Sequence, residues 1–159
     1  MQKLNLDDFE EPINYTLIGI HSNLEGYRLA YFLNKELQLQ LVRQKEDLDF
    51  KHPESYEIYE WTDALNLVTW HLVSNICSTE QAAATNSHTL FSLAATETKT
   101  YYLIPEYKKV NFFLKISDKL CSEENVQQFI KNLQNIPNVV TAYSINPTEL
   151  KSKNNLIFY

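Results

Sequence analysis

The sequence predicts a single α+β domain, a mixed or antiparallel sheet of about six or seven strands with two main helices on one face. Three observations lead to this class. Two segments carry apolar residues at helical spacing, several have the alternation or composition of strands, and the strands in the middle of the chain follow one another without a helix. A doubly wound sheet would need more helices. Because two helices cover only one face, the other face should be partly polar or form an interface.

The composition favours one compact domain and excludes several classes of function. Of the 159 residues, 44% are hydrophobic, too many for a disordered chain. The 20 acidic residues outnumber the 14 basic ones, whereas a nucleic-acid-binding module would present a basic face. Gly19 and Gly26 are the only glycines, which excludes a glycine-rich phosphate-binding loop. We therefore expect no nucleic-acid partner.

Neither a signal peptide nor a membrane span is predicted. The N-terminus carries acids where a signal peptide has its apolar stretch. The longest stretches without a charged side chain, residues 64–79 and 81–96, contain many polar residues and are shorter than the roughly 20 apolar residues of a span. We expect a cytoplasmic protein with no membrane partner. In the reducing cytoplasm, Cys77 and Cys121 are interpreted as small buried hydrophobic residues.

The first part of the chain predicts strand, helix and strand. Residues 1–12 form a weakly ordered acidic lead-in, and residues 13–159 form the domain. Residues 15–20 are apolar on both faces, as in a strand in the middle of a sheet. Ser22 and Glu25 then have capping-box spacing, followed by a helix whose sheet-facing residues are Gly26, Leu29, Ala30, Leu33 and Leu37. Leucine and glutamine alternate over residues 37–43, which predicts a strand buried on one face.

The middle of the chain predicts a run of strands. After a polar loop over residues 44–54, strands at 55–62 and 65–76 should form a hairpin that turns near Asp63 and Ala64. The polar stretch 78–100 should contain a long loop. Strands at 98–104 and 110–116, separated by Pro105 and a short connection, should form another hairpin.

The last part of the chain predicts helix, strand and a short helical turn. Ser122 should cap a helix with Glu123 and Glu124 in its first turn and apolar residues at helical spacing, namely Val126, Phe129, Ile130 and Leu133. A strand at 139–145 and a turn at 146–149 should follow. The apolar tail, residues 156–159, should dock as an edge strand or onto a partner.

The sequence contains no catalytic or metal-binding motif, and we predict no cofactor. Its histidines, at positions 21, 52, 71 and 88, lack the spacing that places two imidazoles on one metal ion. His21 is the main candidate for ligand binding, because it ends a strand just before a helix, where Asn23 and Arg28 could join it. A purely structural role for His21, beside the helix cap, is favoured over ligand binding.

Three segments in order along the chain carry a resemblance to a known family. They are Leu17-Ile18-Gly19-Ile20 with the following Tyr27-Arg28-Leu29-Ala30, then Ile104-Pro105-Glu106 with Val110-Asn111-Phe112, and then the tail from Leu150. Together they resemble the bacterial IPExxxVDY family. The chain has Asn111 and Phe112 where the family name has Asp and Tyr. The resemblance implies no activity, cofactor or site, but a catalytic role for that Asp or Tyr would be lost here.

The residues themselves predict a structural turn at the Ile-Pro-Glu segment. Pro105 cannot donate to a sheet ladder, Glu106 should bond turn amides or pair with Lys108 or Lys109, and Val110 should restart a buried face. A functional site at this segment is the alternative.

We therefore expect a non-enzymatic protein–protein interaction module, whose partner is another protein or a second copy of the chain. The expected interface is the apolar surface that the helices leave over, at Leu24, Tyr27, Tyr31, Phe158 and Tyr159. The alternative is a small-molecule-binding domain or enzyme with a pocket near His21, Asn23, Arg28 and Glu106.

Overall fold

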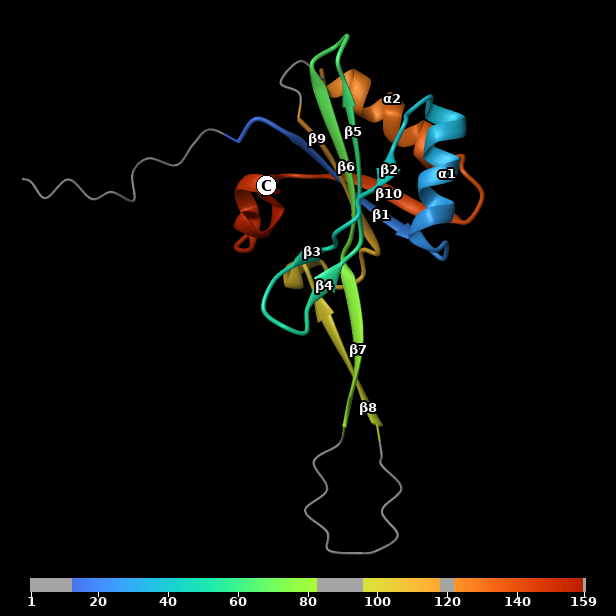
Figure 1. The fold of residues 1–159 in the computed structure, drawn as a ribbon. Helices are drawn as coiled ribbons and strands as arrows, with labels where there is room; N and C mark the ends of the chain where they lie inside the picture. The colour runs from blue at the N-terminus through green and yellow to red at the C-terminus, as the bar shows by residue number, and fades with distance from the viewer. Residues whose placement is uncertain (1–12, 83–95, 118–121, 159) are drawn as a thin grey trace, which may run out of the picture.

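The computed structural model describes residues 13–82, 96–117 and 122–158, so the predicted lead-in lies outside the described residues. Six strands form one antiparallel sheet in the order β10-β1-β9-β6-β5-β2 (Figure 1). The six strands and the two helices are, in chain order, β1 (Thr16–Ser22), α1 (Gly26–Leu37), β2 (Val42–Arg43), β5 (Ile58–Asp63), β6 (Val68–Ser74), β9 (Phe112–Ile116), α2 (Glu123–Gln134) and β10 (Val139–Ile145). The predicted α+β class is confirmed.

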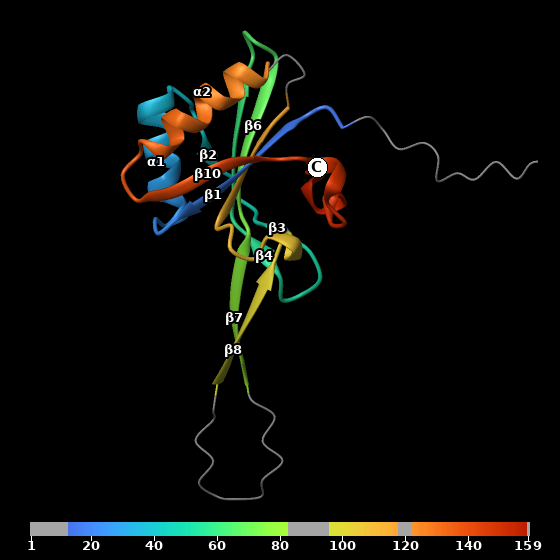
Figure 2. The same ribbon diagram turned by 180° about the vertical axis from the view of Figure 1, so that it is seen from behind.

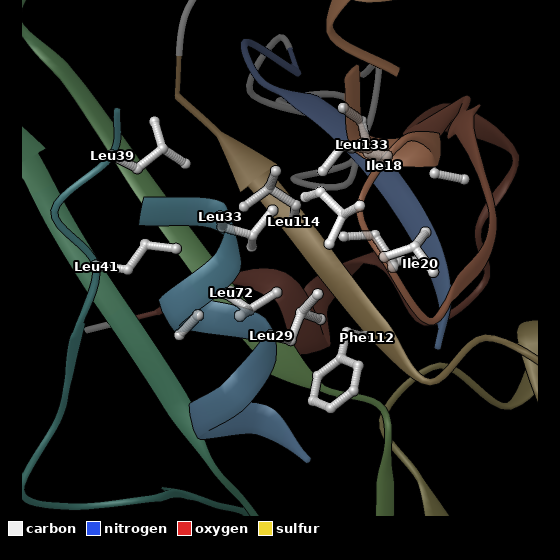
Figure 3. Packing of buried hydrophobic residues seen from close by; sticks show 14 of the residues in the cluster. Ile18, Ile20, Leu29, Leu33, Leu39, Leu41, Leu72, Phe112, Leu114 and Leu133 are labelled. Atoms are coloured by element: carbon white, nitrogen blue, oxygen red, sulfur yellow. The ribbon is translucent and has the colours of Figure 1, made fainter. Parts of the chain in front are cut away.

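Both helices lie on one face of the sheet, as predicted (Figures 1 and 2). Figure 3 shows α1 leucines pointing at strand residues of this face, among them Ile18, Leu72 and Leu114. Of the five residues predicted to face the sheet, Gly26, Leu29, Ala30 and Leu33 are buried and Leu37 is half-buried. Burial of Leu29, Ala30 and Leu33 against the strand residues of this face removes apolar surface from water and stabilises the packing of α1 on the sheet.

The strand predicted to be central is central. β1 lies between β10 and β9, and Leu17, Ile18 and Ile20 are fully buried. Ile18 and Ile20 face the helices, whereas Leu17 belongs to the core on the other face. A strand with neighbours on both edges and cover on both faces needs apolar residues at consecutive positions.

The predicted capping box is wrong. Helix α1 begins at Gly26 after Glu25, whose side chain makes no capping bond. Ser22 is the buried last residue of β1; its hydroxyl donates to the carbonyl of Asn138 at 2.9 Å and accepts from the amide of Leu24 at 3.1 Å. The serine therefore joins the end of β1 to the start of β10 instead of capping the helix.

The predicted strand over residues 37–43 is reduced to β2. Leu39 and Leu41 are buried, as their alternation with glutamine predicts. The backbone of Leu41 is held by a side chain of α1, because Asn34 accepts from the amide of Leu41 at 2.8 Å and donates to its carbonyl at 3.0 Å. The segment thus keeps the burial pattern of a strand with a side chain as its hydrogen-bond partner.

The predictions for the last part of the chain are confirmed except at the tail. Ser122 accepts from the amide of Asn125 at 3.3 Å at the start of α2. β10 has the predicted bounds, and a 3-10 helix, η3 (Pro147–Glu149), follows it. The tail is not an edge strand: Leu156 ends a 3-10 helix, η4 (Lys153–Leu156), and is fully buried.

The second predicted hairpin is wrong. β8 (Thr96–Tyr102) pairs with β7 (Ile76–Ala82), whereas β9 pairs with β1 and β6. The two ends of the stretch predicted to contain a long loop, residues 78–82 and 96–100, therefore belong to a two-stranded antiparallel ribbon, which projects from the domain in both views (Figures 1 and 2). The rest of that stretch, residues 83–95, lies outside the described residues. A second small sheet pairs β3 (Leu48–Asp49) with β4 (Ser55–Tyr56).

The face away from the helices is covered largely by other parts of the chain, which corrects the expectation that it forms an interface. Its core joins sheet residues such as Leu17 and Phe113 to Leu103, Ile104 and Leu156 outside the sheet. The covering elements are the β3–β4 pair, the 3-10 helix η2 (Pro105–Tyr107) and the C-terminal 3-10 helices. We call this the reverse face.

Candidate functional site

The Ile-Pro-Glu segment is a turn held by one buried side chain. Asn75, between β6 and β7, is fully buried. Its Oδ1 accepts from the amide of Ile104 at 2.8 Å, and its Nδ2 donates to the carbonyls of Tyr107 at 2.9 Å and Val110 at 2.8 Å. Two of these bonds satisfy backbone groups that the turn leaves without a partner, the amide of Ile104 and the carbonyl of Val110, whereas the carbonyl of Tyr107 also accepts from the amide of Val110 at 3.0 Å. This agrees with the structural interpretation of the segment.

Glu106 ties the turn to the C-terminal segment. Its carboxylate accepts from the amide of Ser152 at 2.8 Å. Partial burial alone would raise its pKa, but hydrogen bonds from its own amide, Ser152 and Lys151 outweigh this, and the pKa of Glu106 is lowered. Among the described residues no ion pair joins it to Lys108 or Lys109. Glu106 therefore bonds backbone amides, the first of the two predicted roles.

His21 and Glu106 line one open cleft of about 360 Å³, together with Tyr143 and residues 105–110. The Nε2 of His21 lies 3.0 Å from the hydroxyl of Tyr143. Partial burial, and then the charge of Lys109, lower the pKa of His21, which favours the neutral imidazole at pH 7. The cleft thus offers a neutral imidazole, a phenol hydroxyl and two lysines to a ligand.

The other residues predicted for this pocket lie elsewhere. Asn23 and Arg28 are exposed and do not line the cleft. Tyr143, which the sequence analysis did not select, does line it, because the β1–β10 register places it two residues from the partner of His21. Only the strand pairing could have indicated that residue.

Only some of the residues predicted to form an interface are exposed. Tyr27 and Tyr31, on the outer side of α1, are 63% and 59% exposed. Leu24 is buried, so it cannot contribute to an interface. Phe158 is half-buried, with its ring 4.9 Å from that of His71, and Tyr159 lies outside the described residues.

A row of ionisable side chains lies beneath the tail on the reverse face. Glu60, His71 and Lys115 occupy paired positions on β5, β6 and β9. The Nε2 of His71 lies 2.9 Å from the Glu60 carboxylate. Burial lowers the pKa of His71, and the bond to Glu60 opposes this without cancelling it.

Lys115 fastens the tail over this row. Its Nζ donates to the carbonyl of Leu156 at 2.6 Å and lies between the rings of Tyr15 and Phe158, at 4.7 and 4.8 Å from their centroids. Burial lowers the pKa of Lys115. Lys115 therefore has a structural role, because its ammonium group binds the C-terminal tail.

Two further findings concern the described part of the chain. No group of three or more His, Cys, Asp or Glu residues there could hold a metal ion, and neither helix there is long and apolar enough to cross a membrane. Cys77 is buried, as interpreted from the sequence, and Cys121 lies outside the described residues.

The sequence gives little sign of the β7–β8 ribbon. Its base is anchored by Cys77 and Tyr101 against the reverse-face core. Beyond the base, residues 96–100 are all exposed. Threonine alternates with charged residues over this stretch, a period-two pattern typical of a strand, but without apolar residues it resembles a loop.

Comparison of the chain with protein-family models, with curated proteins and with solved structures finds no match. The resemblance to the IPExxxVDY family therefore stays a prediction, and function has to be argued from the geometry above.

Proposed function

We propose that this chain is a protein–protein interaction module that binds through its β7–β8 ribbon. The observation that carries the proposal is the ribbon itself: two seven-residue strands that, among the described residues, belong to a sheet of their own and project from the domain (Figure 1). An isolated two-stranded ribbon is marginally stable in water. Its open edges also present backbone groups to which another strand can add.

The side chains of the ribbon support binding in water rather than burial in a core. Ser78, Glu80 and residues 96–100 are exposed, and most are polar or β-branched. Such residues suit a strand that gains a neighbour on binding, because the new contacts are made by the backbone while the side chains stay hydrated.

Site-specific photo-crosslinking in living cells tests the proposal. We expect a photoreactive amino acid at Thr100, on the ribbon, to give protein adducts, and the same amino acid at exposed Gln40, on the body, to give none. A third position, Tyr31, tests the competing surface on α1. Adducts at Tyr31 alone, or no adducts at Thr100 above those at Gln40, would contradict the proposal.

A second candidate function is binding of a small anionic molecule in the cleft beside His21. It is favoured by one observation: Lys108 and Lys109 line the cleft, and its one lining carboxylate, Glu106, is already bonded to the amide of Ser152. A carboxylate or phosphate would find cationic partners there without an opposing free acid.

A thermal-shift screen with mono- and dicarboxylates and inorganic phosphate tests this candidate. A compound that raises the Tm of the intact chain should lose its effect in His21→Ala and Tyr143→Phe. Arg28→Ala is the matched control, because Arg28 is exposed and outside the cleft. No shift with any compound, or equal loss in the Arg28 variant, would reject the cleft.

A further inference from the structure

We infer that the outer edge of β8, which no described strand covers, binds a second copy of this chain, with the two β8 strands antiparallel about a two-fold axis at Thr98. The inference rests on the proposed function and names its partner. It follows from three features of the ribbon: which backbone groups point outward, which registers they allow, and where the two charges of the strand then fall.

The backbone groups of Thr96, Thr98 and Thr100 point away from β7. Leu103 donates its amide to the carbonyl of Asn75, its opposite residue, at 2.9 Å, which continues the β7–β8 register by one pair. In an antiparallel ladder, hydrogen-bonding residues alternate with residues whose backbone groups point outward. Counting back from Leu103, the odd-numbered residues of β8 bond to β7 and the even-numbered ones face the outer edge.

Those outward groups limit how two β8 strands can pair. An even-numbered residue of one copy must lie opposite an even-numbered residue of the second copy. The two paired residue numbers therefore add up to an even number, and this sum changes by two from one allowed register to the next. With the axis at Thr98, Thr98 lies opposite Thr98 and Thr96 opposite Thr100. Threonine pairs of this kind are favourable cross-strand neighbours.

The same register places opposite charges together. Glu97 of each copy lies directly opposite Lys99 of the other, so the two-fold axis makes two such pairs. Both residues are exposed and on one face of the strand. They fall at non-hydrogen-bonded positions, where opposing side chains approach most closely.

The two nearest alternative registers place like charges together. Moving the axis to position 97 sets Glu97 opposite Glu97, and moving it to position 99 sets Lys99 opposite Lys99. Like charges directly opposite each other are destabilising, so the charges of the strand select the register centred on Thr98. This self-complementarity is the reason to assign the edge to a second copy.

The resulting dimer should be weak and reversible. Only residues 96–100 of each copy take part, a contact smaller than a standard protein interface. The purified full-length chain should therefore show a concentration-dependent monomer–dimer equilibrium, which sedimentation velocity can measure from the micromolar range upward.

Charge reversal tests the register. Glu97→Lys and Lys99→Glu should each raise the dissociation constant of the dimer about tenfold, because each turns both pairs into like-charge pairs. The double variant should return to the affinity of the natural chain. An equimolar mixture of the two single variants should form a heterodimer of similar affinity. The matched controls, Glu36→Lys and Lys35→Glu at exposed positions of α1, should leave the dissociation constant unchanged.

Four results would overturn the inference. They are a chain that stays monomeric at all concentrations, single reversals that dimerise as well as the natural chain, a double variant that is not rescued, and a dimer lost in Tyr31→Ala. Thermal melts of each variant check that it folds. If the purified chain is monomeric while a crosslinker at Thr100 captures a different protein, this inference is false and the proposed function stands. If it captures none, both are false.

Discussion

The two faces of the sheet are covered by different kinds of structure, and the difference decides which residues hold them. On the helix face the cover is α1 and α2, whose backbones satisfy their own hydrogen bonds, so apolar residues at helical spacing are sufficient. On the reverse face the cover is 3-10 turns and irregular chain. Its backbone groups need side-chain partners, which Asn75, Glu106 and Lys115 provide. A face covered by irregular chain therefore depends on a few polar residues.

The largest effect is expected from removing the reverse-face asparagine. Asn75→Ala leaves the amide of Ile104 and the carbonyl of Val110 without their partner at a fully buried site and removes one of two donors to the carbonyl of Tyr107. It should lower the free energy of unfolding by about 3–5 kcal/mol. The matched change on the helix face is Asn34→Ala, which removes two bonds from the backbone of Leu41 and should cost about 1–2 kcal/mol. Urea unfolding measures both. Equal losses would contradict the contrast between the faces.

The two glycines should respond differently to the same substitution. A Cβ at Gly19 would lie 2.8 Å from Ile145 and 3.2 Å from Val110, both buried in the reverse-face core. Gly19→Ala should therefore cost about 1–3 kcal/mol of unfolding free energy. A Cβ at Gly26 would meet the end of the flexible, partly exposed Glu57 side chain. That side chain can turn away, and alanine favours the helix, so Gly26→Ala should lie within about 1 kcal/mol of the natural chain. A larger loss in the Gly26 variant would show that Glu57 cannot move.

The smallest effect should come from acidification. The lowered pKa of His71 means that the unfolded chain binds a proton there more readily than the folded one. Stability from this residue is therefore present above the ordinary histidine pKa of about 6.5 and declines as the pH falls through it. His71→Gln should flatten the change in urea midpoint between pH 7 and pH 5. The control, His52→Gln, changes an exposed histidine and should leave the slope as it is. A slope unchanged in the His71 variant would assign the pH dependence to other groups.

Part of the site could be predicted from sequence, and part could not. His21 and Glu106 were selected by their places at a strand end and in a turn, and the cleft contains both. Arg28 was selected because it is near His21 in the sequence, but one helical turn carries it to an exposed face. Nothing in the sequence near Asn75 or Tyr143 indicates their roles, because these depend on segments more than 25 residues away. Asn75, for example, bonds to Ile104 and Val110, which lie 29 and 35 residues further along the chain.

The order of the two helices and of the strands of the main sheet, the central position of β1 and the sheet-facing side of α1 were determined by local patterns of apolar residues. Such patterns act within a few residues and need no knowledge of the partner. Tertiary structure alone decided that β8 pairs with β7 rather than β9, that Ser22 bonds to Asn138, and that the tail covers the reverse face. Those outcomes depend on competition between distant segments for the same backbone groups and the same apolar surface, and a residue's sequence neighbours carry no record of which segment wins.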